Sequence, residues 1–203
     1  MSQEFTIFPN EYLTQEIKSF YHADYVGYQR SGNPDYINTL KNTYDSYSKD
    51  VLEGACQELI NVLIADLPII IEELAVESIT VCVVPRAKAE NSYQPNQLLF
   101  KKVVQHVCNK LSINDGTDYI IRHANTITTH LPPYTPNYNN DGDAPYPKIT
   151  INTCNISDDV RGKEILLIDD IYTNSINIDE DVIQALLDNG AKTVLFFAVA
   201  YTV

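Results

Sequence analysis

The chain has 203 residues, 44% of them hydrophobic, which is enough to bury a sizeable core and predicts one α/β domain with decorations rather than two separate domains. Its formal net charge of −13 argues against nucleic acid and against anionic membranes as partners, because the field of the surface would repel both. A small molecule, bound in a local basic pocket of an acidic body, fits this charge better.

The four cysteines predict free thiols. They are scattered without any CxxC spacing, and two of them sit in apolar periodic runs, so neither a zinc site nor a disulfide framework is indicated; they are Cys56, Cys82, Cys108 and Cys154. The opening stretch "MSQEFTIFPNEY" has no basic or apolar signal region, and no uninterrupted apolar run approaches the roughly 18 residues of a membrane span. A cytoplasmic protein without a membrane segment is expected.

Residues 1–48 are rich in Tyr, Asn and Ser and have only weak periodicity, which predicts an irregular N-terminal cap. Its tyrosines are expected to pack within the cap or at a subunit interface, so a homodimer is one arrangement consistent with them. The core, residues 49–203, begins with an amphipathic helix: apolar residues recur at helical spacing from Val51, and Pro68 should end or bend it.

The next elements predict a parallel crossover unit. "SITVCVVP", residues 78–85, is continuously apolar and β-branched, as in a strand buried on both faces. A basic loop with Arg86 and Lys88 follows, then a helix with an apolar stripe over residues 99–111, then a short strand in "TDYIIRH". Strand, helix and strand in this order form the parallel unit of α/β domains, so the fold class expected is α/β with a mostly parallel sheet flanked by helices.

A long loop and a polar strand end come next. Residues 131–148, "LPPYTPNYNNDGDAPYPK", contain five prolines and predict a lid, a binding loop or a linker. "KITINT" alternates like a half-exposed strand. The apolar run of residues 165–168 reads as another buried strand, which stops at Asp169 and Asp170. Because ligands of open α/β sheets sit beyond the carboxyl ends of the strands, these two carboxylates should face a site.

The segment after this acidic pair indicates an anion site. "TNSIN" supplies hydroxyl and amide groups, and a helix is predicted directly after it, with Asn177 as N-cap, Glu180 completing a capping box and Gly190 just past its end. Free backbone N–H groups and the positive dipole end at a helix N-terminus favour a phosphate.

These motifs resemble those of the type I phosphoribosyltransferases, especially the ComF-like branch. "ILLIDDIYTNSIN", followed by a helix and "NGAKTV", is similar to the family's signature for phosphoribosyl diphosphate. "VVPRAKAENSYQPNQLLFKKV" looks like the strand, basic loop and helix that precede it in that branch, and "IIRHANTITTH" lies where its next strand and mobile loop fall. The resemblance covers about residues 78–203, and it implies a type I phosphoribosyltransferase-like fold.

The resemblance also implies a set of roles. Asp169 and Asp170 would bind the ribose hydroxyls and contact Mg²⁺ through water or substrate, and the negative charge of Asp170 would help the reaction at the anomeric carbon. Arg86 and Lys88 would hold pyrophosphate with Mg²⁺, and Arg122 with residues 131–148 would be candidates for a lid. The loop that would hold the 5-phosphate comprises Thr173, Asn174, Ser175, Ile176 and Asn177.

This loop departs from the family pattern, which leaves more than one function open. Ser175 stands where the family usually has Gly, and Asn174 and Asn177 stand at two usual Thr positions. Serine resists the positive φ and the close backbone approach that glycine permits. The favoured function is Mg²⁺-dependent transfer of phosphoribose from phosphoribosyl diphosphate to a nitrogen acceptor. The alternatives are a weakened ribose-phosphate-binding regulatory module and a scaffold or effector protein.

Overall fold

A six-stranded, mostly parallel sheet forms the centre of the molecule. The computed structural model describes residues 2–74, 76, 78–129, 131, 138–146 and 149–203. The strand order is β1-β2-β8-β7-β3-β4, and only the β1–β2 pair is antiparallel. The strands are β1 (Gln3–Ile7), β2 (Ile17–Tyr25), β3 (Ile79–Val83), β4 (Asn114–Asp115), β7 (Glu164–Tyr172) and β8 (Thr193–Thr202). The expected α/β class with a mostly parallel sheet is confirmed.

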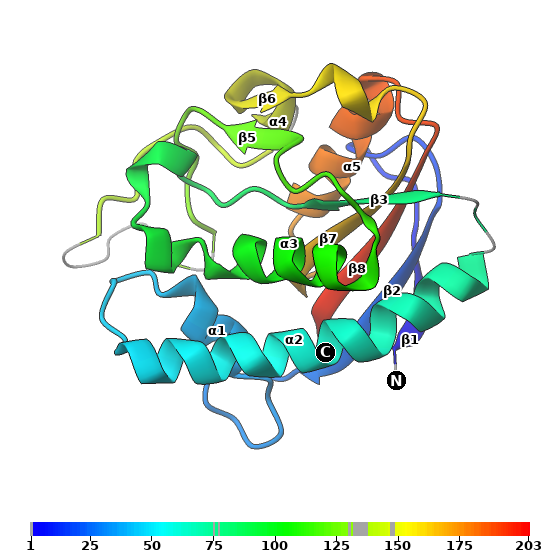
Figure 1. Cartoon of the computed structure of the whole chain (residues 1–203). Coiled ribbons are helices and arrows are strands. Elements are labelled where there is room, and N and C mark those ends of the chain that lie inside the picture. Colours follow the sequence, from blue (N-terminus) through cyan, green and yellow to red (C-terminus); the bar gives the residue numbers. More distant parts are fainter. Residues whose placement is uncertain (1, 75, 77, 130, 132–137, 147–148) are drawn as a thin grey trace.

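Helices cover both faces of the sheet and enclose two hydrophobic cores (Figure 1). One face carries α1 (Tyr36–Lys41), α2 (Lys49–Leu74) and α3 (Leu99–Leu111), and the other carries α5 (Ile178–Asp188). Three short 3₁₀ turns connect elements: η1 (Glu90–Ser92), η2 (Pro95–Gln97) and η3 (Asp158–Val160). All four cysteines are free, as expected.

Strand β7 shows why the sheet is buried on both sides. Ile165 and Leu167 belong to the core under α5, whereas Leu166 and Ile168 belong to the core under α2 and α3, and all four are fully buried. Successive side chains of a strand point to opposite faces, so a continuous apolar run needs a core on each side. The strand continues through the acidic pair to Tyr172, so these aspartates lie in the second half of the strand rather than after it.

The prediction of an irregular segment over residues 1–48 is wrong for residues 3–7 and 17–25, which form β1 and β2. Strand β2 pairs in parallel with β8, and its Phe20 lies opposite Phe197 and is only 2% exposed. The polar residues of this segment obscure the alternation of apolar and polar side chains that would predict a strand. Pairing with the long apolar strand β8 stabilises β2 although its own residues have a weak preference for strand structure. Residues 26–48 contain α1 and lie beside the sheet's carboxyl edge.

Two expected strands also differ from the structure. The strand expected in "TDYIIRH" exists as β5 (Ile120–Arg122), but it pairs antiparallel with β6 (Cys154–Ile156) outside the main sheet, and the crossover from β3 through α3 ends in β4. The strand expected in "KITINT" is wrong: α4 (Ile149–Thr153) forms there. The Thr150 N–H at the start of α4 donates to Asp181 Oδ2 at 2.8 Å. The free N–H groups of a helix N-terminus need such acceptors, and this one lies 31 residues away, so the local sequence does not reveal it.

Helix α2 runs through Pro68 and ends at Leu74, so the proline does not end it. By length and composition alone α2 could cross a membrane, a criterion that core helices of globular domains also meet. Its Leu59, Leu63 and Leu67 are fully buried in the core beneath the sheet. Much of the expected 131–148 loop, residues 132–137 and 147–148, falls outside the described residues.

The burial of Phe20 gives a test of whether the N-terminal strands belong to the folded core. Replacing Phe20 by Ala should cost about 3–5 kcal/mol of unfolding free energy, because it leaves a cavity between β2 and the helices. Phe8→Ala is the matched control: this side chain is 66% exposed, and its loss should change stability by no more than about 0.5 kcal/mol. Urea denaturation measures both. Equal, small effects would show that the N-terminal segment is a detachable cap.

Candidate functional site

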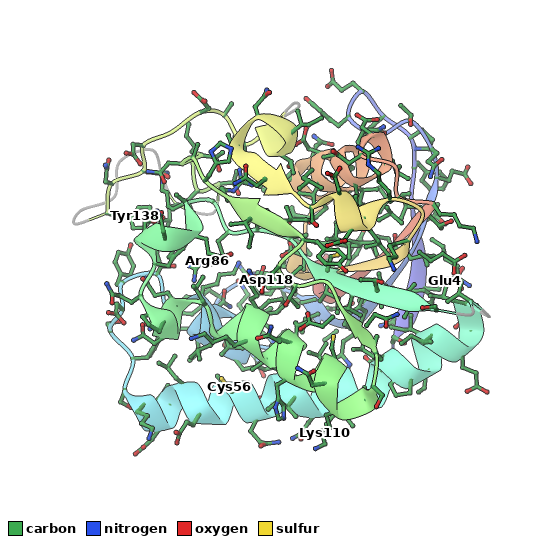
Figure 2. The ribbon with its side chains drawn as sticks, turned by 45° about the horizontal axis from the view of Figure 1, so that its top comes forward. Glu4, Cys56, Arg86, Lys110, Asp118 and Tyr138 are labelled. Atoms are coloured by element: carbon green, nitrogen blue, oxygen red, sulfur yellow. The ribbon has the colours of Figure 1, made fainter. Side chains whose placement is uncertain are left out.

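A cavity of about 570 Å³ opens at the carboxyl ends of the parallel strands. Its lining includes the ends of β2, β8 and β7 and the loop that follows β3, residues 84–88. Parallel strands end on one edge of the sheet, and the polar side chains that follow them therefore converge there. Figure 2 shows Arg86 and Tyr138, two lining residues, on the same side of the molecule, with Glu4 of β1 on the opposite side.

Asp169 and Asp170 form the acidic wall of the cavity. The Asp170 carboxylate lies 3.1 Å from the ammonium of Lys41, the last residue of α1, and both side chains are largely buried. Lys41 is a site residue that the sequence analysis missed, because it belongs to the segment expected to be irregular and follows no recognisable motif. This ion pair ties the N-terminal segment to the end of β7.

A third carboxylate, Asp179 of α5, completes this wall. Asp179 is 3% exposed and lines the cavity, and among the described residues its Oδ1 atom has no hydrogen-bond partner. Burial raises the pKa of Asp169 to about 7, the charge of Asp170 adds to this shift, and Lys41 opposes it. Burial also raises the pKa of Asp179 well above its usual range, and the charges of Asp169 and Glu180 act in the same direction.

The first turn of α5 differs from the expected capping box. Asn177 occupies the N-cap position, but its side chain makes no capping bond and accepts a hydrogen bond from Asn10 Nδ2 at 3.1 Å. The Glu180 carboxylate accepts from the Tyr172 hydroxyl at 2.9 Å instead of bonding the helix backbone. Asp179, Glu180 and Asp181 are all buried in this turn, so the chain's own carboxylates face the positive end of the helix dipole. The helix ends as predicted, with Gly190 at a φ of +93°.

The expected phosphate loop is only partly at the cavity. Thr173 and Ile176 line it, whereas Asn174, Ser175 and Asn177 do not. The Thr173 hydroxyl pairs with the Thr202 hydroxyl at 2.8 Å, and the Ile176 N–H donates to the Thr173 carbonyl. The turn thus uses some of its hydroxyl and N–H donors in hydrogen bonds of its own. A phosphate in the cavity would contact only Thr173 and Ile176 of the five loop residues expected to bind it.

Arg86 and Arg122 form the basic side of the cavity. The Arg86 guanidinium stacks on the Tyr93 ring, 4.3 Å from its centroid, and one N–H donates to the Gln97 carbonyl. A guanidinium carries five N–H donors, so this contact leaves it capacity for an anion. Arg122 is 4% exposed, and its Nε donates to the Arg86 carbonyl at 2.7 Å. This hydrogen bond holds the backbone of the loop after β3 in place. Burial lowers the pKa of Arg122, but the group keeps its charge at neutral pH.

Lys88 has a structural role in this arrangement. Its ammonium contacts the Thr126 carbonyl at 3.0 Å and both the carbonyl and the carboxylate of Asp141. An ammonium has three donors, so these three acceptors satisfy it. Lys88 therefore lines the cavity but anchors the segment that contains Asp141 and Tyr138, rather than offering donors to a ligand.

The cavity concentrates positive charge in an acidic protein. Among the described residues, five basic and four acidic side chains line it, in a chain with 14 basic and 27 acidic residues. The basic residues are Lys41, Arg86, Lys88, Lys101 and Arg122, and the acidic ones are Glu90, Asp169, Asp170 and Asp179. Six tyrosines also contribute to the lining: Tyr25, Tyr28, Tyr44, Tyr47, Tyr93 and Tyr138.

Comparison with known protein families, curated proteins and solved structures finds no match to this chain. Among the described residues, no group of three or more His, Cys, Asp or Glu side chains is placed to hold a metal ion.

The raised pKa of Asp169 predicts a pH-dependent gain in stability from Asp169→Asn. Because the folded-state pKa lies near 7 and that of an unfolded Asp near 3.9, the wild-type protein loses stability as the pH rises from about 4 to about 7. The uncharged amide avoids this loss, so the increase in Tm should be larger at pH 8 than at pH 5, by about 2–4 °C or more. Thermal unfolding at both pH values measures it.

Asp158→Asn is the control, since this side chain is 92% exposed and should give the same small change at both pH values. An Asp169→Asn variant that gains no more at pH 8 than at pH 5 would show that the Asp169 carboxyl ionises in the folded protein as freely as in water.

Proposed function

We propose that the cavity binds phosphoribosyl diphosphate, or a related ribose phosphate, and that the protein is a Mg²⁺-dependent phosphoribosyltransferase of the type I kind. The observation that carries this proposal is that, among the described residues, five basic side chains gather around one cavity in a chain of net charge −13. In such a chain, cations at the end of a parallel sheet favour a small anionic ligand, because the field elsewhere repels it.

The lining of the cavity contains both cations and carboxylates, which suits a ligand that carries phosphates and hydroxyl groups. Arg86 offers planar N–H donors to a diphosphate, and the Arg122 charge adds to the attraction, whereas Lys101 is already paired with Glu90 and Asp118. On the other side, Asp170 and Asp169 are acceptors for a vicinal diol. The Lys41 ammonium beside Asp170 offsets the repulsion between this carboxylate and a neighbouring phosphate, and the carboxylate can still accept hydrogen bonds from the diol.

Mg²⁺ fits this donor set only together with the ligand. The ion prefers one or two carboxylates, substrate phosphates and retained water to an all-protein cage, and Asp169 and Asp170 are the carboxylates at hand. When bound, Mg²⁺ would supply charge neutralisation for the departing pyrophosphate. Asp170 would stabilise the positive charge that develops on the ribose at the anomeric carbon, and the surrounding lining would exclude water.

A second candidate is binding without turnover, as in a regulatory module. The first turn of α5 favours it, because Asp179, Glu180 and Asp181 occupy the position where the 5-phosphate would meet bare helix amides. Asn174, Ser175 and Asn177 are not part of the cavity lining, so they would give the 5-phosphate no hydrogen bonds there, and its binding would be weaker.

Pyrophosphate release separates the two candidates. The wild-type protein with phosphoribosyl diphosphate, Mg²⁺ and a panel of nitrogen bases should release pyrophosphate, and Asp170→Asn should reduce the rate by about 100-fold or more, because it removes the charge closest to the developing cation. Asp158→Asn, at the opposite end of β7, should leave the rate unchanged.

Tight binding of phosphoribosyl diphosphate without any release would favour the regulatory module. An unchanged rate in Asp170→Asn would exclude this residue from the reaction. Absence of both binding and release would contradict the proposed function itself, and leave a scaffold role for the fold.

A further inference from the structure

A second, smaller pocket lies between the end of β1, the end of β7 and the start of α5. Its volume of about 320 Å³ is at the lower end of the roughly 300–1,000 Å³ that ligand pockets span, so it suits a small ligand. The two linings share no described residue. Asn174, which was expected to contact a phosphate in the larger cavity, belongs to this pocket instead.

The pocket is lined by a buried carboxyl group that is only half satisfied. Glu180 is 1% exposed, and its Oε1 atom accepts from the Tyr172 hydroxyl at 2.9 Å. Its Oε2 atom has no hydrogen-bond partner in the described part of the chain. A buried carboxylate oxygen without a donor is unfavourable, so a ligand that brings an N–H donor into the pocket would gain from meeting it.

The surroundings of Glu180 favour a ligand with a positive charge. Burial raises the pKa of Glu180, whereas its own backbone N–H and the Tyr172 hydroxyl oppose this shift. A cation placed beside the carboxyl group would favour the ionised form further. The net charge of −13 also concentrates cations around the protein and repels anions.

Aromatic rings make up much of the remaining lining. The ring centroids of Phe5, Tyr172 and Tyr201 lie 5.0–5.4 Å from one another, and the 66% exposed Phe8 also lines the pocket. Aromatic rings attract an organic cation over their faces and pack against its methylene groups. A metal ion would instead need a full shell of oxygen ligands, which a lining rich in aromatic rings does not offer.

We propose that this pocket binds the primary ammonium group of an aliphatic amine. The ammonium donates to Glu180 Oε2 and to the side-chain oxygen of Asn174, and the aliphatic chain packs against Phe5 and Phe8. The site stands apart from the ribose-phosphate cavity, so it holds whether or not the protein is a phosphoribosyltransferase.

The experiment is an NMR titration of the ¹⁵N-labelled full-length protein with n-butylammonium chloride, with n-butanol as the uncharged ligand of similar shape and with potassium chloride. Butylammonium should shift the backbone amide of Glu180 and the side-chain amide of Asn174. Butanol should bind at least about tenfold more weakly, because it brings no charge to the carboxylate. Potassium chloride at the same concentration should leave these signals in place.

A lysine side chain carries the same chemical group as a free amine. Nα-acetyl-lysine methylamide therefore serves as a second ligand: tighter binding than that of butylammonium would assign the site to a lysine of a peptide, and weaker binding to a free amine. Either result supports the ammonium site itself.

Glu180→Gln keeps an oxygen for the Tyr172 hydroxyl but removes the charge, and should weaken butylammonium binding by about tenfold or more. Glu16→Gln is the matched control, since it removes the same charge from an exposed position and should leave the affinity unchanged. Equal affinity of wild-type protein and a folded Glu180→Gln would overturn the inference. So would butanol binding as tightly as butylammonium, potassium displacing butylammonium at equal concentration, or no shift of the pocket signals, and these comparisons on the wild-type protein need no variant.

Discussion

Parallel pairing of β2, β8, β7 and β3 is the constraint from which the cavity follows. Because these strands run in one direction, their carboxyl ends meet on a single edge, and whatever polar residues come next in the chain converge there. Asp169 and Asp170 come from β7, Arg86 follows β3, and Thr202 ends β8. Segments more than a hundred residues apart in sequence therefore build one site, at the edge of a sheet whose two faces are buried by the two hydrophobic cores.

The cavity combines charges that would be unstable in isolation. Asp170 has Lys41 beside it, whereas Asp169 has the carboxyl of Asp179 as its neighbour, and the helix end behind them is already occupied by carboxylates. A basic side built from Arg86 and Arg122 faces this acidic wall. Buried polar groups of this kind rarely favour stability, and their retention around a cavity is typical of a binding or catalytic site.

The sequence predicted the apolar elements well, because periodicity reports burial directly. The both-face-buried strand that leads to Asp169, the stripe on α3 and the glycine at the end of α5 are all present. Prediction from the sequence failed where contacts between residues distant in the chain determine the structure. Strand β2 depends on β8, α4 depends on a carboxylate of α5, and Lys41 reaches the site only because α1 packs beside the sheet edge. Of the expected site residues, Arg86, Lys88, Arg122, Asp169, Asp170, Thr173 and Ile176 line one cavity, and Asn174, Ser175 and Asn177 do not.

The most direct test of the account is a crystal structure of the protein with a non-hydrolysable analogue of phosphoribosyl diphosphate and Mg²⁺. We expect the diphosphate against the Arg86 guanidinium and the ribose diol within hydrogen-bonding distance of Asp170, with Lys41 still beside that carboxylate. An analogue bound elsewhere on the surface, or a cavity that stays free of it at saturating concentration, would contradict the central claim that this edge of the sheet is a ribose-phosphate site.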